Sequence, residues 1–179
     1  MIKKSMKFIA PFITIILLNT VLTSSIEAKQ KEPQQTPQQK ISQTQQQTSS
    51  PDSIEYLTSA ETTSLNLPFS EAVRVGNMLY LSGTLGNIPG TKKLVPGGIK
   101  AETKQTMENI KRILEKNGSS LSQVVTCNVM LADIKEWGAM NQLYVTYFPK
   151  NRLPARSTLG ASGLALNARV EIQCMATVK

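Results

Sequence analysis

Only about the last two thirds of this 179-residue chain has the pattern of apolar residues that a folded core requires. Residues 29–63 consist mainly of Gln, Pro, Ser and Thr, with very few apolar side chains. Such a segment cannot bury enough apolar surface to offset the conformational entropy that it would lose on ordering. We therefore predict a disordered tether over residues 29–63 and one folded domain over residues 64–179, which is long enough to enclose a core.

The first 28 residues have the layout of an export signal. Three lysines precede an uncharged, largely apolar run over residues 8–22, and small and polar residues follow it up to Ala28. This order is typical of a secretory signal peptide, whereas a membrane-spanning helix needs about 20 apolar residues. We expect cleavage after Ala28 or Ser25 and export of the domain to the periplasm or the medium. An uncleaved membrane anchor is the alternative.

The net charge of +8 is concentrated in the predicted domain. Residues 64–179 hold 14 Lys and Arg against seven acidic residues, but only Lys92-Lys93 and Lys111-Arg112 stand together. Binding to a phosphate backbone requires a basic stripe or patch. We therefore expect a basic, solvated surface and no nucleic-acid partner.

The chain contains no His and only two Cys. These counts exclude an imidazole general base, Ser-His-Asp and Cys-His catalysis, histidine-bearing metal sites and a Cys₄ cluster. Any chemistry must therefore come from carboxylates, Arg, Lys, Tyr, hydroxyls, backbone groups or a thiol. Cys127 and Cys174 both fall in predicted strands. We expect them to be buried and reduced, with a disulfide as the alternative that export would permit.

Turn signals and periodicity predict the first elements of the domain. Gly76-Asn77 separates two alternating apolar runs, over residues 72–75 and 78–82, which predicts a β-hairpin. Apolar residues at helical spacing then predict a helix over residues 99–117, with Gly118 just beyond its end.

The second half of the domain repeats the alternation of strand and helix. Residues 124–131 form a predicted buried strand, and Asp133 with Glu136 resembles a capping box at the start of a second helix. Pro149 ends that helix, and residues 169–178 form the last strand. The order ββ-α-β-α-β predicts an α/β (α+β) sandwich, with two helices on one face of a mixed sheet. We expect a homo-oligomer to bury the other face, because a bare apolar sheet face invites association.

Two charged residues occupy unusual positions. Arg156 follows a stiff Pro154-Ala155 step, and Glu171 lies fifteen residues later inside the apolar strand, on the same face as Gln173. A carboxylate among apolar neighbours must be paired, linked to water or functional. From spacing alone, a structural ion pair, a salt bridge between subunits and a catalytic pair all remain open.

Several short motifs follow one another in the order found in a known family. They are Phe69-Ser70-Glu71-Ala72-Val73, Val75-Gly76-Asn77, Leu81-Ser82-Gly83, Glu108-Asn109-Ile110, Asn141-Gln142-Leu143-Tyr144, Phe148, Pro154-Ala155-Arg156-Ser157-Thr158 and Val170-Glu171-Ile172. The chain resembles the RidA (YjgF/YER057c/UK114) family of reactive-intermediate deaminases from about Leu67 to Lys179. The Pro-Ala-Arg-Ser block with the later Val-Glu-Ile is the most specific part of the resemblance.

The resemblance implies a fold, an assembly and a reaction. The fold would be chorismate-mutase-like, assembled as a homotrimeric barrel with three clefts between subunits. The reaction would be the hydrolytic deamination of 2-imino or enamine acids, such as 2-iminopropionate and 2-iminobutyrate, to 2-keto acids and ammonia. Neither a metal nor an organic cofactor is expected, because an imine is already electrophilic and water supplies the nucleophile.

The resemblance also assigns residues to the site by position. Arg156 would hold the substrate carboxylate in its planar guanidinium fork. Glu171 would activate the attacking water and pass its proton to the leaving ammonia. The other matched cleft positions are Phe69, Ser82, Gly83, Asn141 and Thr158.

The sequence departs from the common family pattern at five positions. Phe69 stands where many members have Tyr, Leu67 replaces Gly, Thr84 replaces Gln, Ala165 replaces Pro and Gln173 replaces a second acid. Neither predicted catalytic residue is among them, so the departures bear on substrate preference and rate.

Two other classes of function stay open alongside the deaminase. The same cleft could serve a protein that binds small carboxylic acids without turnover, which an exported location favours. The basic domain could alternatively act on RNA, as ribonuclease-like relatives do.

Overall fold

The structure is a computed structural model that describes residues 53–178. The predicted signal peptide and residues 29–52 of the predicted tether lie outside the described residues. Within the described part, no helix has both the length and the apolar character needed to span a membrane.

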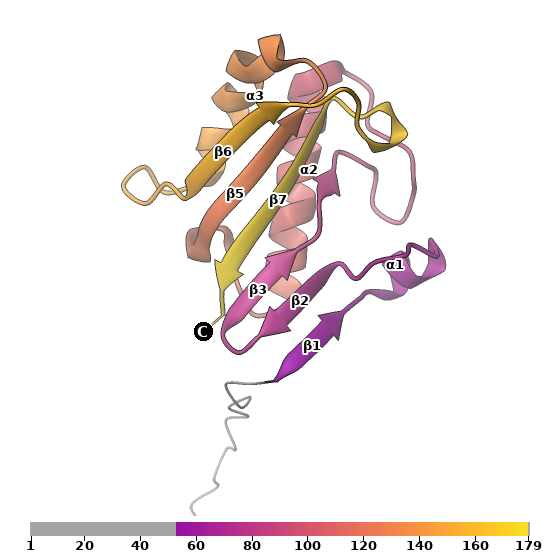
Figure 1. Cartoon of the computed structure of the whole chain (residues 1–179), viewed down its shortest axis with the longest axis vertical. Helices are drawn as coiled ribbons and strands as arrows, with labels where there is room; N and C mark the ends of the chain where they lie inside the picture. The colour runs from indigo at the N-terminus through magenta and orange to yellow at the C-terminus, as the bar shows by residue number, and fades with distance from the viewer. Residues whose placement is uncertain (1–52, 179) are drawn as a thin grey trace, which may run out of the picture. The chain divides into compact units, whose positions relative to one another are not determined.

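A single mixed sheet of seven strands forms the centre of the domain (Figure 1). The strands run in the spatial order β1 (Ile54–Leu57), β2 (Ala72–Val75), β3 (Met78–Leu81), β7 (Val170–Thr177), β5 (Val124–Leu131) and β6 (Ala155–Gly160), and the short β4 (Thr84–Leu85) pairs with β7. Every pairing is antiparallel except that of β5 with β6. The predicted hairpin is confirmed, with Ala72 opposite Leu81 and Gly76 in the left-handed region at φ 55°.

Two helices cover one face of this sheet (Figure 1). They are α2 (Gly98–Lys116) and α3 (Trp137–Tyr144), while α1 (Ala60–Ser64) is a short turn between β1 and β2. Four 3₁₀ turns complete the structure, over Leu121–Gln123, Ile134–Glu136, Val145–Tyr147 and Ala165–Asn167. The predicted arrangement of two helices on one face of a mixed sheet is therefore confirmed.

The core lies between the sheet and the two helices. Along β7 the alternate residues Val170, Ile172, Cys174 and Ala176 are buried, as the predicted alternation requires. The helices contribute further fully buried side chains to this layer: Met107, Ile110, Leu114 and Met140. Burial of these apolar faces is the main force that holds the two layers together.

The opposite face of the sheet has no covering layer among residues 53–178. Strand register places five exposed apolar side chains on this open face, between 37% and 74% exposed: Ile54, Tyr56, Val75, Tyr80 and Leu159. Four of the five lie together on β1, β2 and β3, whereas Leu159 lies apart on β6. Exposed apolar side chains grouped in this way mark an interaction site.

The ordered domain begins earlier than the predicted boundary at Ser64. β1 adds a strand to the edge of the sheet beside β2, and α1 follows with its first turn capped by Ser59, whose hydroxyl accepts the Thr62 amide at 3.1 Å. The prediction of disorder up to residue 63 is therefore wrong for residues 54–63. The run that forms β1 is only four residues long and polar residues surround it, so composition alone does not predict this strand.

The predicted capping box at Asp133 does not form. Asp133 accepts the Lys135 amide at 2.9 Å and begins a 3₁₀ turn, so that α3 starts only at Trp137. Glu136 instead accepts two hydrogen bonds from Arg169 Nε, at 2.9 and 3.0 Å. This contact raises the pKa of the Arg169 guanidinium and joins the start of α3 to the start of β7.

Cys127 and Cys174 form a disulfide, so the expectation of reduced cysteines is wrong. The two residues lie directly opposite each other on β5 and β7, with Cα atoms 4.1 Å apart, and both are fully buried. The sequence indicates that each cysteine is in a strand, but only the register of the two strands brings the sulfurs together.

Removing the disulfide should destabilise the domain. The cross-link joins residues 47 positions apart, and closing a loop of this length stabilises a fold by about 2–4 kcal/mol. We expect the Cys127→Ala/Cys174→Ala variant to lose about this much free energy of unfolding in a denaturant titration. A reductant should lower the denaturant midpoint of the wild type and leave the midpoint of the double variant unchanged. If the reductant does not change the wild-type midpoint, the disulfide is contradicted.

Candidate active site

The predicted site residues fall into two groups that lie on different elements of the fold. The arginine half consists of Arg156 and Thr158 on β6 together with Asn141 on α3. The glutamate half consists of Glu171 on β7 together with Phe69, Ser82 and Gly83, which lie in or next to the segments before β2 and β4.

Arg156 is held by aromatic and amide side chains of α3. Its strand position is opposite Cys127, so its side chain projects from the helix-covered face of the sheet. Nη1 donates to Asn141 Oδ1 at 2.6 Å, and the guanidinium carbon lies 4.8 Å from the centroid of the Tyr144 ring and 5.8 Å from that of Trp137. These cation–π contacts orient the guanidinium. Only one of its five N–H donors is bonded within the described part of the chain, so the others can receive an anion.

Two buried hydroxyl groups lie on the elements that hold Arg156. The hydroxyls of Thr158 and Tyr144 are buried and have no hydrogen-bond partner among residues 53–178. Burial raises the pKa of Tyr144 to about 12, while the charge of Arg156 acts in the opposite direction. Tyr144 is therefore neutral at physiological pH, and its hydroxyl keeps its proton. Donors without acceptors suit a carboxylate better than any cationic or apolar group.

Glu171 lies against a glycine in the glutamate half. A Cβ atom placed on Gly83 would be 1.8 Å from Glu171 Oε1 and 2.8 Å from its Cδ. No residue larger than glycine can therefore occupy position 83 without displacing the carboxylate. The backbone of Gly83 is not in the left-handed region, so space alone demands the glycine.

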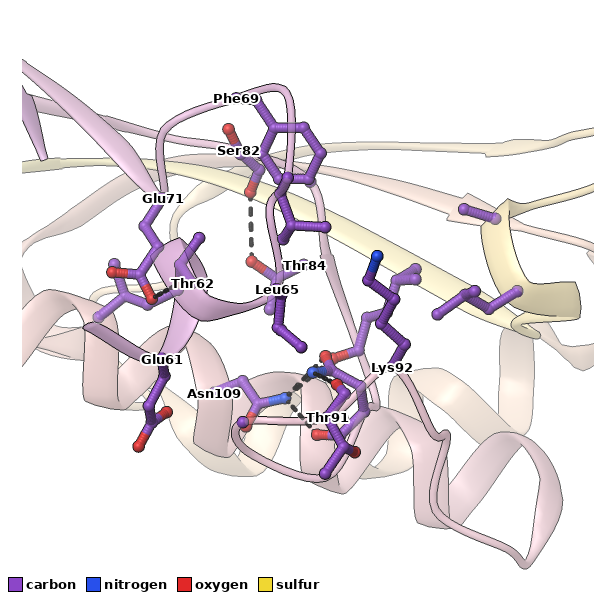
Figure 2. Close-up of a pocket in the computed structure, with 18 of the residues that line it drawn as sticks. Glu61, Thr62, Leu65, Phe69, Glu71, Ser82, Thr84, Thr91, Lys92 and Asn109 are labelled. Atoms are coloured by element: carbon purple, nitrogen blue, oxygen red, sulfur yellow. Dashed lines mark hydrogen bonds between the residues drawn. The ribbon is translucent and has the colours of Figure 1, made fainter. Parts of the chain in front are cut away.

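A cavity of about 320 Å³ opens beside the glutamate half (Figure 2). Phe69, Ser82 and Gly83 line it, whereas Glu171 touches Gly83 without lining the cavity itself. Two hydrogen bonds fix the wall: Ser82 Oγ donates to the carbonyl of Ser70 at 2.7 Å, and Thr84 Oγ1 donates to the carbonyl of Ser82 at 3.2 Å.

Asn109 of α2 fixes the floor of this cavity. Its Nδ2 donates to the carbonyls of Leu85 and Asn87, at 3.0 and 2.9 Å, which ties the loop after β4 to the helix (Figure 2). The Glu108-Asn109-Ile110 motif thus has a structural role in shaping the cavity.

Arg156 and Glu171 do not meet within one chain. β5 separates their strands, the two residues are offset by three positions, and their side chains leave opposite faces of the sheet. These spacings put roughly 14 Å between the two Cα atoms. The ion pairs of the described residues do not include this pair, so an intramolecular structural ion pair is excluded.

Residues 61–178 match the model of the family described as Endoribonuclease L-PSP. Together with relatives named reactive-intermediate deaminases, this match decides the family. The chain belongs to the RidA family. The resemblance found in the motifs is therefore confirmed.

Named relatives and a solved structure agree with this assignment. The chain is 41% identical over 111 residues to Reactive Intermediate Deaminase A, chloroplastic, of Arabidopsis thaliana, covering 62% of this chain and 59% of that protein, which is less than two thirds of its length. It is 40% identical over 109 residues to the mouse 2-iminobutanoate/2-iminopropanoate deaminase, covering 61% and 80% of the two chains. The crystal structure of RidA from Psychrobacter sp. PAMC 21119 superposes with a TM-score of 0.60 at 35% identity, covering 69% of this chain and 94% of that one. The RidA-family fold expected from the sequence is confirmed.

Two site residues of this RidA-family chain were not identified from the sequence. They are Trp137 and Tyr144, which lie in the predicted second helix together with Asn141. Their spacing of four and then three residues puts all three on one helical face. The helical spacing therefore indicates that the three residues lie together. It does not indicate that Arg156 packs against them, because that contact depends on the edge strand β6, which the sequence does not predict.

Proposed function

We propose that this protein hydrolyses 2-imino and enamine acids to 2-keto acids and ammonia. The observation that supports it most is Arg156, a stacked guanidinium whose remaining donors are free for a substrate carboxylate. The mouse relative named above is a 2-iminobutanoate/2-iminopropanoate deaminase, and it is 40% identical to this chain over 109 residues.

The proposed mechanism divides the work between the two halves. Arg156 binds the substrate carboxylate and fixes the imine carbon facing Glu171. The substrate enters as the protonated imine. Glu171 takes a proton from water as the water oxygen bonds to the imine carbon, and the C=N π electrons move to the nitrogen, which becomes an amine. Glu171 then donates that proton to the amine nitrogen. As the C–N bond breaks and ammonia leaves, the hydroxyl proton passes back to the Glu171 carboxylate and on to water, and the carbonyl forms.

We further propose that the protein is a homotrimer whose sites form between chains. Two observations support this. Arg156 and Glu171 leave opposite faces of one sheet, so a site that uses both needs a second copy. The open face of the sheet exposes apolar side chains on β1, β2 and β3, which the same association would cover.

We also propose export through the N-terminal signal, with the domain working in the periplasm or the medium. The disulfide between Cys127 and Cys174 supports this location, because disulfides persist in oxidising compartments and are rare in a reducing cytosol.

Ammonia release from freshly generated 2-iminopropionate and 2-iminobutyrate tests the proposed reaction. An amino-acid oxidase can supply both imines, and the full-length protein should accelerate ammonia release above the spontaneous rate. Binding of 2-oxobutyrate without any acceleration would instead identify a carboxylate-binding protein. Salt-dependent binding of RNA, with no hydrolysis of either imine, would favour the ribonuclease-like function.

A further inference from the structure

Four charged residues line the cavity beside the glutamate half, and partners neutralise three of them. Arg112 Nη1 lies 3.6 Å from Glu61 Oε2. Glu71 accepts hydrogen bonds from the hydroxyls of Ser59 and Thr62 at 2.9 and 2.6 Å, and its other oxygen lies 4.0 Å from Lys116 Nζ. These pairs leave the ammonium of the fourth residue, Lys92, as the one charge of the lining without a counter-charge in residues 53–178.

The loop that precedes Lys92 is anchored so that this lysine faces the cavity. Thr91 donates through its amide and its hydroxyl to the carbonyl of Ile88, at 3.0 and 2.9 Å, and Asn87 Nδ2 donates to the carbonyl of Thr91 at 3.0 Å. In Figure 2 the Lys92 side chain extends from this loop toward the interior of the cavity. Lys92 and Lys93 are both exposed, but Lys93 does not line the cavity.

The size and the walls of the cavity indicate what could reach Lys92. Its volume of about 320 Å³ is at the lower end of the range for small-molecule sites, and a four-carbon imino acid fills only part of it. Leu65, Leu67, Phe69 and Leu166 make much of the wall apolar. A ligand with a short carbon chain that extends through the cavity would bring the end of that chain to the unpaired ammonium of Lys92. A carboxylate at this end would form an ion pair with the ammonium.

We propose that Lys92 binds a second acidic group of the substrate, so that the protein prefers the 2-imino acids derived from acidic amino acids. This inference rests on the proposed deaminase function. The carboxylate next to the imine binds Arg156 of a neighbouring copy, and the side-chain carboxylate extends past Phe69 to Lys92. Hydrolysis at the imine carbon is unchanged; Lys92 contributes to the choice of substrate.

Steady-state kinetics of two variants test the preference. Imines generated by an amino-acid oxidase from L-glutamate and L-2-aminobutyrate serve as the dicarboxylic and monocarboxylic substrates. Lys92→Met should lower the ratio of their kcat/KM values roughly tenfold, the effect of losing one charge-assisted contact. The matched control Lys93→Met should leave the ratio as in the wild type. Equal ratios in the wild type and Lys92→Met, or the same fall in Lys93→Met, would overturn the proposal.

A binding measurement separates this inference from the proposed reaction. Calorimetry on the full protein should give tighter binding of 2-oxoglutarate than of 2-oxobutyrate, with the difference lost in Lys92→Met and kept in Lys93→Met. If the protein hydrolyses no imine but retains this pattern, the deaminase function fails and the Lys92 subsite stands. If Lys92→Met binds both acids as the wild type does, the subsite fails whatever the activity.

Discussion

Replacing Arg156 with Ala should lower kcat/KM for 2-iminobutyrate about 10²- to 10³-fold, the cost of removing one partner of a desolvated, hydrogen-bonded charge pair. The substrate carboxylate would lose its guanidinium fork, and the imine carbon would no longer be fixed for attack. Steady-state rates of ammonia release measure the loss. A melting curve recorded beside them distinguishes it from unfolding, because Asn141 Oδ1 also loses its donor at 2.6 Å.

Two further variants show whether the shape or only the charge of Arg156 matters. Arg156→Lys keeps the positive charge but loses the planar fork and the stacking on Tyr144, so its activity should remain well below that of the wild type. Arg152, an exposed residue four positions earlier, is the matched control, and Arg152→Ala should keep the wild-type rate. A wild-type rate in Arg156→Ala would contradict the role assigned to this residue.

The second large effect should follow from a single added methyl group. Gly83→Ala places a Cβ atom 1.8 Å from Glu171 Oε1, so the carboxylate must move away from its position in the glutamate half. Displacing a catalytic group by about 1 Å costs on the order of 10²-fold in rate, and we expect kcat to fall by about that much. Glu171→Gln should give a loss of at least this size, because it removes the proton acceptor.

The control for Gly83→Ala is a glycine with room around it. Gly163 has no atom within 4 Å of the Cβ that an alanine would add, so Gly163→Ala should keep the wild-type kcat. The melting temperature of Gly83→Ala should stay close to that of the wild type, since only the end of a flexible side chain has to move. An unchanged kcat in this variant would exclude Glu171 from the chemistry.

The parts of the fold that could be predicted are those coded by neighbouring residues. Gly76-Asn77 specifies its own tight turn, and the helical spacing of Met107, Ile110 and Leu114 identifies the buried side of α2. Alternation along β7 likewise predicts that Ile172 and Glu171 point to opposite faces of the sheet, and this prediction needs no other part of the chain.

The parts that could not be predicted depend on contacts between distant segments. β6 is an edge strand whose polar residues give little alternation, and only its pairing with β5 makes it a strand. The disulfide depends on the register that sets Cys127 opposite Cys174. The same register decides that Arg156 and Glu171 leave opposite faces, although family motifs name both as members of one site.

Mixing two inactive chains tests most directly whether each site is built from two copies. Arg156→Ala and Glu171→Gln chains would be unfolded together in equal amounts and allowed to reassemble. In a cyclic assembly, random mixing puts an intact Arg156 beside an intact Glu171 at about one interface in four, so about a quarter of the wild-type activity should return. If both residues served the site from the same chain, no mixed assembly would hold an intact site, and the mixture would stay as inactive as either variant alone.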